Sequence, residues 1–352
     1  MFILANNKNF NIMKKLLLLL ALPMIGFGQN VNIPDPDFKQ YLVGNAAINT
    51  NGDAHIQVSE ASAFNGSIIC MQCGWSDLTG IQAFTALTVL KCNDNDLATL
   101  DVSQNIALTI LECDRNNLTT LDVSQNTALT KLSVWENNLT SLNVNSNIAL
   151  MNLICKDNEI TTLDLSQNTA LTSFNCEYNQ ISSLDVSQNT ALISLGCSYN
   201  LLTSMNVDNN AVLEKLTFAN NQITSLNVTN NTELTQLNAD NNLLTSLDVR
   251  NGNNSNMTIS GYSFRAVNNP NLTCVSVDDP AWSTIHWYNT DPWMTFSSDC
   301  SGTTSIQQLI TITNKKLLKV TDLLGRETQP TNNEVLIYMY DDGTTEKKFS
   351  AN

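Results

Sequence analysis

The sequence predicts a mainly β solenoid, a stack of similar coils, and three observations support this class. Hydrophobic positions recur at a strict spacing of 21 residues from Leu97 to Leu244. Each unit contains the pattern Leu-x-x-Leu-x-(Val or Cys)-x-x-Asn twice, and asparagine therefore recurs at two fixed places. A fixed period of this kind indicates coils that cannot bury an apolar face alone and do so by stacking.

Each half of the unit has the pattern of a short strand. We call the half that contains Leu132 and Val134 the first half, and the half that contains Leu121 and Val123 the second. In each half these two residues lie two positions apart, so both side chains point to the same side. Stacked coils bring equivalent residues into columns about 4.8 Å apart, the spacing of neighbouring strands. Because both halves carry this pattern, we expect parallel strands on both sides of the coil and few helices. The predicted repeat region is 76–251.

Two asparagine columns run along the predicted stack. An inward asparagine can hydrogen-bond the turn backbone of its own coil and of adjacent coils, so both columns are interpreted as structural. The first column contains Asn95, Asn116, Asn137, Asn158, Asn179, Asn200, Asn221 and Asn242. The second contains Asn105, Asn126, Asn147, Asn168, Asn189, Asn210 and Asn231.

The unit as a whole, from Leu118 to Asn137, resembles the nested 21-residue class of leucine-rich repeats, written LxxLxCxxNxLxxLDLxxN. The resemblance covers roughly Leu78 to Asn251. It implies a leucine-rich-repeat solenoid with few helices. The strand patterns after residue 302 separately predict a small C-terminal β-domain.

The nine cysteines divide into three groups. Five share one column, which elsewhere holds Val134, Phe218 and Ala239, so they are interpreted as buried free thiols; a metal or disulfide ladder is the alternative. These five are Cys92, Cys113, Cys155, Cys176 and Cys197. Cys274 and Cys300 lie outside the repeat and are the predicted disulfide of a secreted protein. For Cys70 and Cys73 a bridge is left open.

The N-terminus has the pattern of a secretion signal. Lys14 and Lys15 precede an apolar run at 16–27 that is short for a membrane span, with cleavage expected after Gly28. The predicted signal peptide is therefore 1–28, with Met13 as the more natural start. An uncleaved anchor is the alternative, and no other segment is apolar enough to span a bilayer. The expected location is outside the cell or on its outer surface.

The predicted N-terminal cap, 29–75, contains a helix at 35–43 and a loop that resembles the calcium loop of an EF-hand. The candidate metal ligands are Asn49, Asn51, Asp53, His55, Gln57 and Glu60. Two departures weaken the resemblance, because Asn49 replaces the usual Asp and Ala54 replaces the usual Gly. It therefore implies weak calcium binding, and a turn without metal is the alternative.

Two segments follow the repeats. Residues 252–301 are the predicted C-terminal cap, in which Trp282, Trp287, Trp293 and Phe296 cover the last coil or, alternatively, form a platform for carbohydrate. Residues 302–352 have strand patterns at 309–313, 317–321 and 335–340. Their Asp-Leu-Leu-Gly-Arg-Glu run (322–327) and the closing run 340–349 resemble the sorting domain of the type IX secretion system. That resemblance implies the type IX export machinery as a partner; a plain β-domain is the alternative.

The predicted function is binding rather than catalysis. The formal net charge of −15 argues against nucleic acid, and the two histidines have no catalytic motif around them. The first half of the unit has variable residues where interfaces use aromatic and basic side chains. The candidate binding residues are Arg115, Trp135, Lys156, Tyr178 and Tyr199. We expect an adhesin that binds a protein on another surface. The alternatives are a glycan-binding accessory protein of extracellular polymer breakdown and a structural surface component.

Overall fold

The computed structural model describes residues 28–257, 263–300 and, in the C-terminal region, 317–323, 325–328, 335–340 and 345–349. The predicted signal peptide, apart from Gly28, and the predicted strand at 309–313 lie outside these ranges. In the described ranges, no helix is both long enough and apolar enough to cross a membrane.

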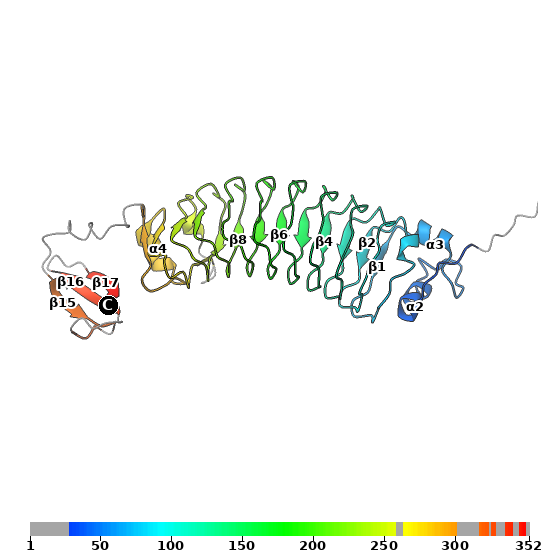
Figure 1. Ribbon diagram of the computed structural model, residues 1–352, viewed down its shortest axis with the longest axis horizontal. Coiled ribbons are helices and arrows are strands. Elements are labelled where there is room, and N and C mark those ends of the chain that lie inside the picture. The colour runs from blue at the N-terminus through cyan, green and yellow to red at the C-terminus, as the bar shows by residue number, and fades with distance from the viewer. Residues whose placement is uncertain are drawn as a thin grey trace, which may run out of the picture.

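The first halves of the units form a long parallel sheet, seen in Figure 1 as a row of short arrows along the stack. Pairing is in register, so Leu132 of one coil lies between Leu111 and Leu153 of its neighbours. Within the described residues this sheet has ten strands. They are β1 (Ser67–Ile69), β2 (Val89–Lys91), β3 (Ile110–Glu112), β4 (Lys131–Ser133), β5 (Asn152–Ile154), β6 (Ser173–Asn175), β7 (Ser194–Gly196), β8 (Lys215–Thr217), β10 (Gln236–Asn238) and β12 (Phe264–Arg265).

A second parallel sheet lies on the other side of the coils, which confirms the prediction of strands on both sides. In the described residues it has four strands and is confined to the C-terminal part of the stack. They are β9 (Ser225–Asn227), β11 (Ser246–Asp248), β13 (Cys274–Ser276) and β14 (Thr295–Ser297). In the earlier coils the equivalent segments are not paired as strands, although their leucines, such as Leu121 and Leu142, are still buried.

The interior consists of the columns that the spacing predicts. The leucine, valine and cysteine columns are buried, except at Leu184 and Met205, which are partly buried. Asparagine side chains tie each coil to the one before it. Asn116 Nδ2 donates to the carbonyls of Cys92, Cys113 and Asp114, while its Oδ1 accepts from the Leu97 N–H. The structural interpretation of the asparagines is therefore confirmed: they satisfy turn backbone groups that the sheets do not reach.

The five column cysteines are free and fully buried. Burial raises the pKa of Cys92 and Cys155 to about 12 and raises that of Cys113, Cys176 and Cys197 as well. A thiol that stays protonated is a poor nucleophile and a poor metal ligand, so these side chains act as small apolar groups of the core.

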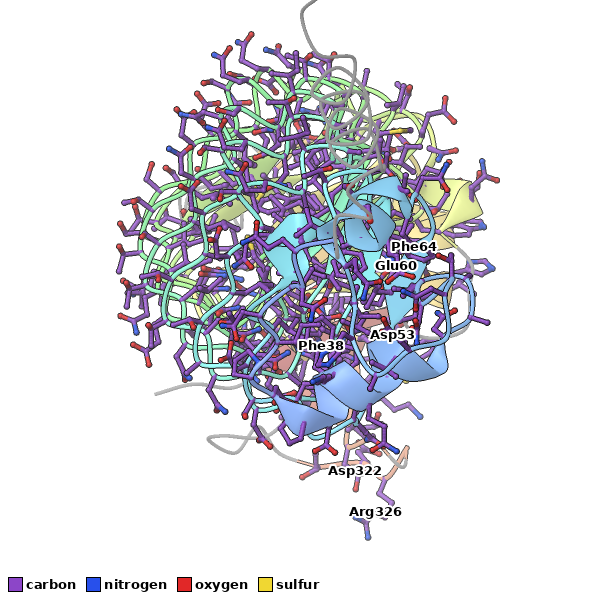
Figure 2. The ribbon with its side chains drawn as sticks, turned by 90° about the vertical axis from the view of Figure 1, so that its right-hand side faces the viewer. Phe38, Asp53, Glu60, Phe64, Asp322 and Arg326 are labelled. Atoms are coloured by element: carbon purple, nitrogen blue, oxygen red, sulfur yellow. A yellow bond between two sulfur atoms is a disulfide. The ribbon has the colours of Figure 1, made fainter. Side chains whose placement is uncertain are left out.

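The N-terminal end of the stack is covered by α2 (Pro36–Gly44) and α3 (Val58–Ala63), with the short helix η1 (Ile81–Ala83) beneath α3. Asp35 caps α2 through the N–H groups of Asp37 and Phe38, and Pro36 suits the first turn. The other carboxylate oxygen of Asp35 accepts from the Ser76 N–H, which joins the helix to the first coil. Figure 2 looks onto this end, with Phe38 of α2 and Phe64 after α3 in front of the coils.

The C-terminal end differs from the predicted cap, because coils continue past residue 252. β12 extends the long sheet, and β13 and β14 extend the second one. Asn269 takes the role of the first asparagine column, with Nδ2 bonded to the Ala239 and Ala266 carbonyls. An insertion containing the short helix η2 (Asn254–Asn256) breaks the 21-residue spacing there. Because of this break, the added coils cannot be recognised from the period of the sequence. A disulfide joins Cys274 to Cys300, the pair that the sequence predicts, and another joins Cys70 to Cys73.

The C-terminal region forms a small antiparallel sheet of β15 (Leu317–Thr321), β16 (Val335–Tyr340) and β17 (Thr345–Phe349), with β16 in the middle. Arg326 pairs with Asp322 across the turn after β15, with 2.6 Å between Nε and Oδ2. Val320 and Leu336 are the buried hydrophobic residues of the described part of this sheet.

Candidate binding surface

The outer face of the long sheet, with the turns that directly follow its strands, carries most of the basic residues of the solenoid. The sequence has seven lysines and arginines between 76 and 300. Six lie on this face: Lys91, Arg115, Lys131, Lys156, Lys215 and Arg265. Acidic residues accompany them, and Glu112 bridges Lys91 at 3.2 Å and Lys131 at 2.6 Å. The outer face of the long sheet is therefore charged but nearly balanced, as protein-binding surfaces often are.

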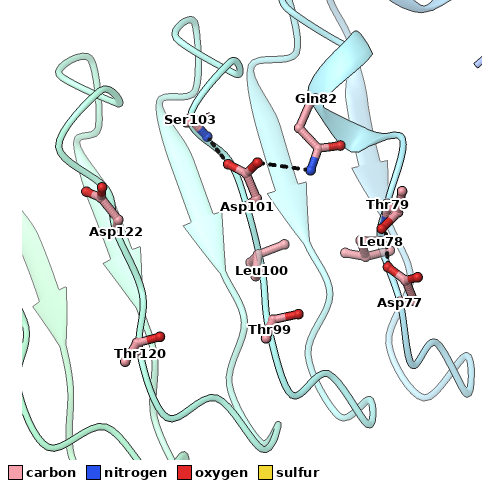
Figure 3. Close-up of a pocket in the computed structure, with 10 residues that line it drawn as sticks. All are labelled: Asp77, Leu78, Thr79, Gln82, Thr99, Leu100, Asp101, Ser103, Thr120 and Asp122. Carbon is pink, nitrogen blue, oxygen red and sulfur yellow. Dashed lines mark hydrogen bonds between the residues drawn. The ribbon is translucent and has the colours of Figure 1, made fainter. Parts of the chain in front are cut away.

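The opposite side of the coils is acidic. Its aspartates serve their own turns: Asp101 Oδ1 accepts from the Ser103 N–H at 3.0 Å, and Asp122 accepts from the Ser124 N–H at 2.8 Å. These bonds lower the pKa of both carboxyls, which stay charged at neutral pH. Figure 3 shows a shallow hollow of 330 Å³ on this side, in which Gln82 donates to Asp101. The aspartate column is accounted for by turn formation and solvation.

Trp135 lies between two basic side chains from the coils on either side. The Arg115 guanidinium carbon is 4.1 Å, and the Lys156 ammonium nitrogen 4.3 Å, from the centre of its ring. The indole N–H donates to Asp157 at 2.8 Å, and Arg115 is paired with Asp94 and Glu136. Cation–π contacts and ion pairs therefore hold this aromatic ring in one orientation. Three of the five predicted residues meet here.

Tyr178 and Tyr199 form a second cluster. Their rings stack with centres 4.1 Å apart and planes 11° apart, which confirms that residues one coil apart lie as neighbours. Their exposed fractions are 45% and 44%, so much of the pair faces solvent. The structure thus divides the five predicted residues into two groups along one face.

Many of these residues occupy a column with an unusual backbone. The position before each first-column asparagine has φ between +51° and +62° in every coil from Asp94 to Asn268. Aspartate and asparagine tolerate this left-handed region, and five of the nine positions carry one of them. The other four are Arg115, Glu136, Tyr178 and Tyr199. Sequence reasoning did not identify this column, although the residue before each column asparagine was available as a signal.

The predicted calcium loop is closed by its own hydrogen bonds. The side-chain amides of Asn51 and Gln57 bond each other at 2.7 Å, and both donate to Asp53 Oδ2. Glu60 accepts from the N–H groups of Thr50, Asn51 and Gln57 (Figure 2 shows Asp53 and Glu60). Asn49 instead accepts from the Gly52 N–H, and the backbone of His55 donates to Asp53. Among the residues described, no three His, Cys, Asp or Glu side chains are grouped as a metal site.

Calcium binding by this loop stays a prediction, and we expect a weak affinity because only Asp53 and Glu60 of the six candidates are acidic. Burial opposes ionisation of Glu60, but hydrogen bonds from the backbone of Gln57, Asn51 and Thr50 and from the Thr50 hydroxyl lower its pKa. Its contribution to stability is therefore present above the ordinary glutamate pKa and is lost as pH falls through the lowered value. Calorimetric titration of the protein with Ca²⁺ tests whether the loop binds the metal, and no heat together with no thermal shift would contradict calcium binding. E60Q should destabilise the loop whether or not calcium binds.

The tryptophans at the C-terminal end have different environments. Trp287 is buried and stacks on Phe264 at 4.1 Å, so it acts as core of the last coils. Trp282 is partly buried and stacks on His286, the last residue of α4 (Pro280–His286). Trp293 is 40% exposed. These rings do not share one exposed plane, which disfavours the alternative of a flat carbohydrate platform.

No protein-family model matches the chain, and no curated protein matches it. Among solved structures, the chain is similar to internalin C2 of Listeria monocytogenes, with a TM-score of 0.51 and 18% identity over 59% of this chain and 96% of that one. It is also similar to the functional domain of InlJ from Listeria monocytogenes, which includes a cysteine ladder, with a TM-score of 0.43 and 23% identity over 92% of this chain and 99% of that one. A leucine-rich-repeat protein of Leptospira interrogans matches with a TM-score of 0.42 and 20% identity, over 62% of each chain.

At these identities, the similarity establishes the fold. The internalin C2 match, the in-register parallel sheet and the two asparagine columns agree with one another. The protein is a leucine-rich-repeat solenoid.

Proposed function

We propose that this solenoid binds a protein partner through the outer face of its long sheet and acts by binding rather than catalysis. The observation that carries the proposal is the column of positions with positive φ that runs from Asp94 to Asn268. Arg115, Tyr178 and Tyr199 occupy backbone positions where a bulky residue costs about 1 kcal/mol or more. Large exposed side chains kept at such positions suggest selection for contact, because the fold itself would favour asparagine there.

The distribution of residue types also supports the outer face of the long sheet as the binding surface. The outer face of the long sheet presents arginine, tryptophan and tyrosine, the residue types that dominate interface energetics. The opposite side repeats the same aspartate, serine and threonine residues from coil to coil, as a solvated surface does. A partner of mixed charge fits the nearly balanced face better than a strongly basic or strongly acidic one.

The repeat itself supplies variants that the fold tolerates, because other coils carry different residues at the equivalent positions. W135S, Y178N and Y199N place residues that other coils carry at the same positions, namely Ser198, Asn220 and Asn241. We expect the triple variant to keep its melting temperature and to lose the partner in affinity capture with immobilised full-length protein. The matched control is D122N, D164N and D185N on the acidic side, which should capture as the wild type does. Identical sets of retained proteins for the wild type, the triple variant and the control would contradict the assignment of binding to this face.

We also propose that the protein reaches the outer surface or the medium by an N-terminal signal and a C-terminal sorting domain. The apolar run after Lys15 supports the signal, and the antiparallel sheet β15–β16–β17 with the Asp322–Arg326 turn supports the sorting domain. Deletion of 302–352 in a host with type IX secretion should retain the protein in the periplasm. Export of the truncated chain would refute the sorting role.

A further inference from the structure

The outer face of the long sheet contains a polar depression of 340 Å³ between the Tyr178–Tyr199 pair and the last coils. It arises because small residues lie at successive positions of coils 7 and 8, which contain β7 and β8. Gly196 and Ser198 belong to the first of these coils and Ala219 to the second. Larger side chains flank them, with Glu177 on one side and Asp240 and Arg265 on the other.

Glu177 crosses the first of these coils because Gly196 has no side chain. Its Oε1 lies 3.3 Å from where a Cβ on Gly196 would be and accepts from the Thr217 hydroxyl at 3.0 Å, two coils away. A side chain at Gly196 would crowd this carboxylate. The glutamate is therefore held in position before any ligand arrives, which lowers the cost of binding.

The side chains on the opposite wall of the depression are also held in place by hydrogen bonds. Asp240 is 5% exposed and accepts from Arg265 Nε at 2.6 Å and from the Val267 N–H at 2.8 Å. Within the described residues, the two terminal nitrogens of Arg265 have no hydrogen-bond partner, and its side chain is 31% exposed. It therefore offers fixed donors toward the depression.

Tyr199 provides the aromatic part of the rim. One face of its ring is covered by Tyr178, so the other face is turned toward the next coil. There the column changes from tyrosine to Asn220 and then Asn241, which are shorter and also line the depression. One open aromatic face thus lies beside amides, hydroxyls, two carboxylates and one guanidinium.

From this arrangement we propose that the depression binds a neutral sugar residue, a ligand site beyond the proposed protein-binding function. Vicinal hydroxyls both donate and accept, so they match carboxylate, amide and guanidinium groups that are fixed in place. The C–H face of a pyranose packs on an exposed aromatic ring. An apolar side chain would find little apolar lining, and an anion would face an excess of carboxylate. The volume lies near the lower end of the range of about 300–1,000 Å³ for ligand pockets.

The test uses saturation-transfer NMR on the full-length protein. The probes are methyl glycosides of glucose, galactose and mannose, methyl N-acetylglucosaminide and, as a zwitterionic comparison, glycylglycine. We expect transfer from the protein to the ring protons of at least one glycoside, with a Kd of about 1 mM for a single sugar. A219Q should weaken this binding at least tenfold by filling the depression, and Y199A should reduce it similarly.

The fold should tolerate A219Q, because the same column carries Trp135, Lys156 and Glu177 in earlier coils. An unchanged melting temperature checks this, and D122N, on the acidic side away from the depression, should bind sugar as the wild type does. No transfer to any glycoside, transfer to glycylglycine alone, or equal sugar binding by a folded A219Q would overturn the proposal. None of these outcomes bears on protein capture through Trp135, so the two ideas can fail separately.

Discussion

Replacement of Asn137 by alanine is expected to lower the free energy of unfolding by about 3–4 kcal/mol. Its Nδ2 donates to the carbonyls of Cys113, Val134 and Trp135, and its Oδ1 accepts from the Leu118 N–H. Alanine would leave several of these buried backbone groups without a partner, and each one costs about 1–3 kcal/mol. Urea denaturation followed by circular dichroism measures the loss.

The second asparagine column provides the matched comparison. Asn126 is more deeply buried than Asn137, but it makes only two bonds, from Nδ2 to the carbonyls of Val102 and Asn105. Its buried Oδ1 accepts no hydrogen bond from the described chain. We expect N126A to cost about 1–2 kcal/mol, less than N137A, because the number of backbone groups left unpaired decides the loss. Equal losses, or a larger loss for N126A, would show that burial dominates.

Replacement of Trp75 by alanine is expected to detach the N-terminal cap at a cost of about 3–5 kcal/mol, the range for large core aromatics. Trp75 is fully buried and contacts Phe38 and Tyr41 of α2 edge to face, with ring centres 5.1 Å and 5.3 Å away. The cavity left by the missing indole ring would lie between α2 and the first coil and weaken the contact between them. Hydrogen exchange should show faster exchange in α2 than in coils near the centre of the stack.

Phenylalanine at this position is the control. The Trp75 Nε1–H has no hydrogen-bond partner in the described chain, so W75F removes volume without breaking a bond. We expect W75F to lose about half as much stability as W75A or less, and to keep the protection of α2. Unchanged protection of α2 in W75A would argue that Asp35, with its bond to the Ser76 N–H, suffices to hold the cap.

Much of this fold follows from position along the chain. The 21-residue period places Leu111, Leu132 and Leu153 in one buried, in-register column, and the asparagines take the structural role that their spacing predicts. The cysteine column could be interpreted because Val134 and Phe218 share its place. In a repeat, equivalent residues have equivalent neighbours, so the linear spacing already defines the packing environment.

Other features depend on contacts that spacing does not encode. The second sheet forms only in the C-terminal coils, and two further coils follow an insertion that disrupts the period. The five predicted binding residues divide into a Trp135 cluster and a tyrosine pair, and Glu177 reaches Thr217 only because Gly196 leaves room.

The sequence by itself determined the solenoid, its register and its buried columns. Stacking the coils in register buries far more apolar surface than any other arrangement of the same chain, and the free energy of that burial decides the fold. The tertiary structure decided the surface: which charges pair, which rings stack and where a depression opens. Those outcomes depend on side chains with several accessible partners and energy differences of about 1 kcal/mol or less, which only the positions of neighbouring coils resolve.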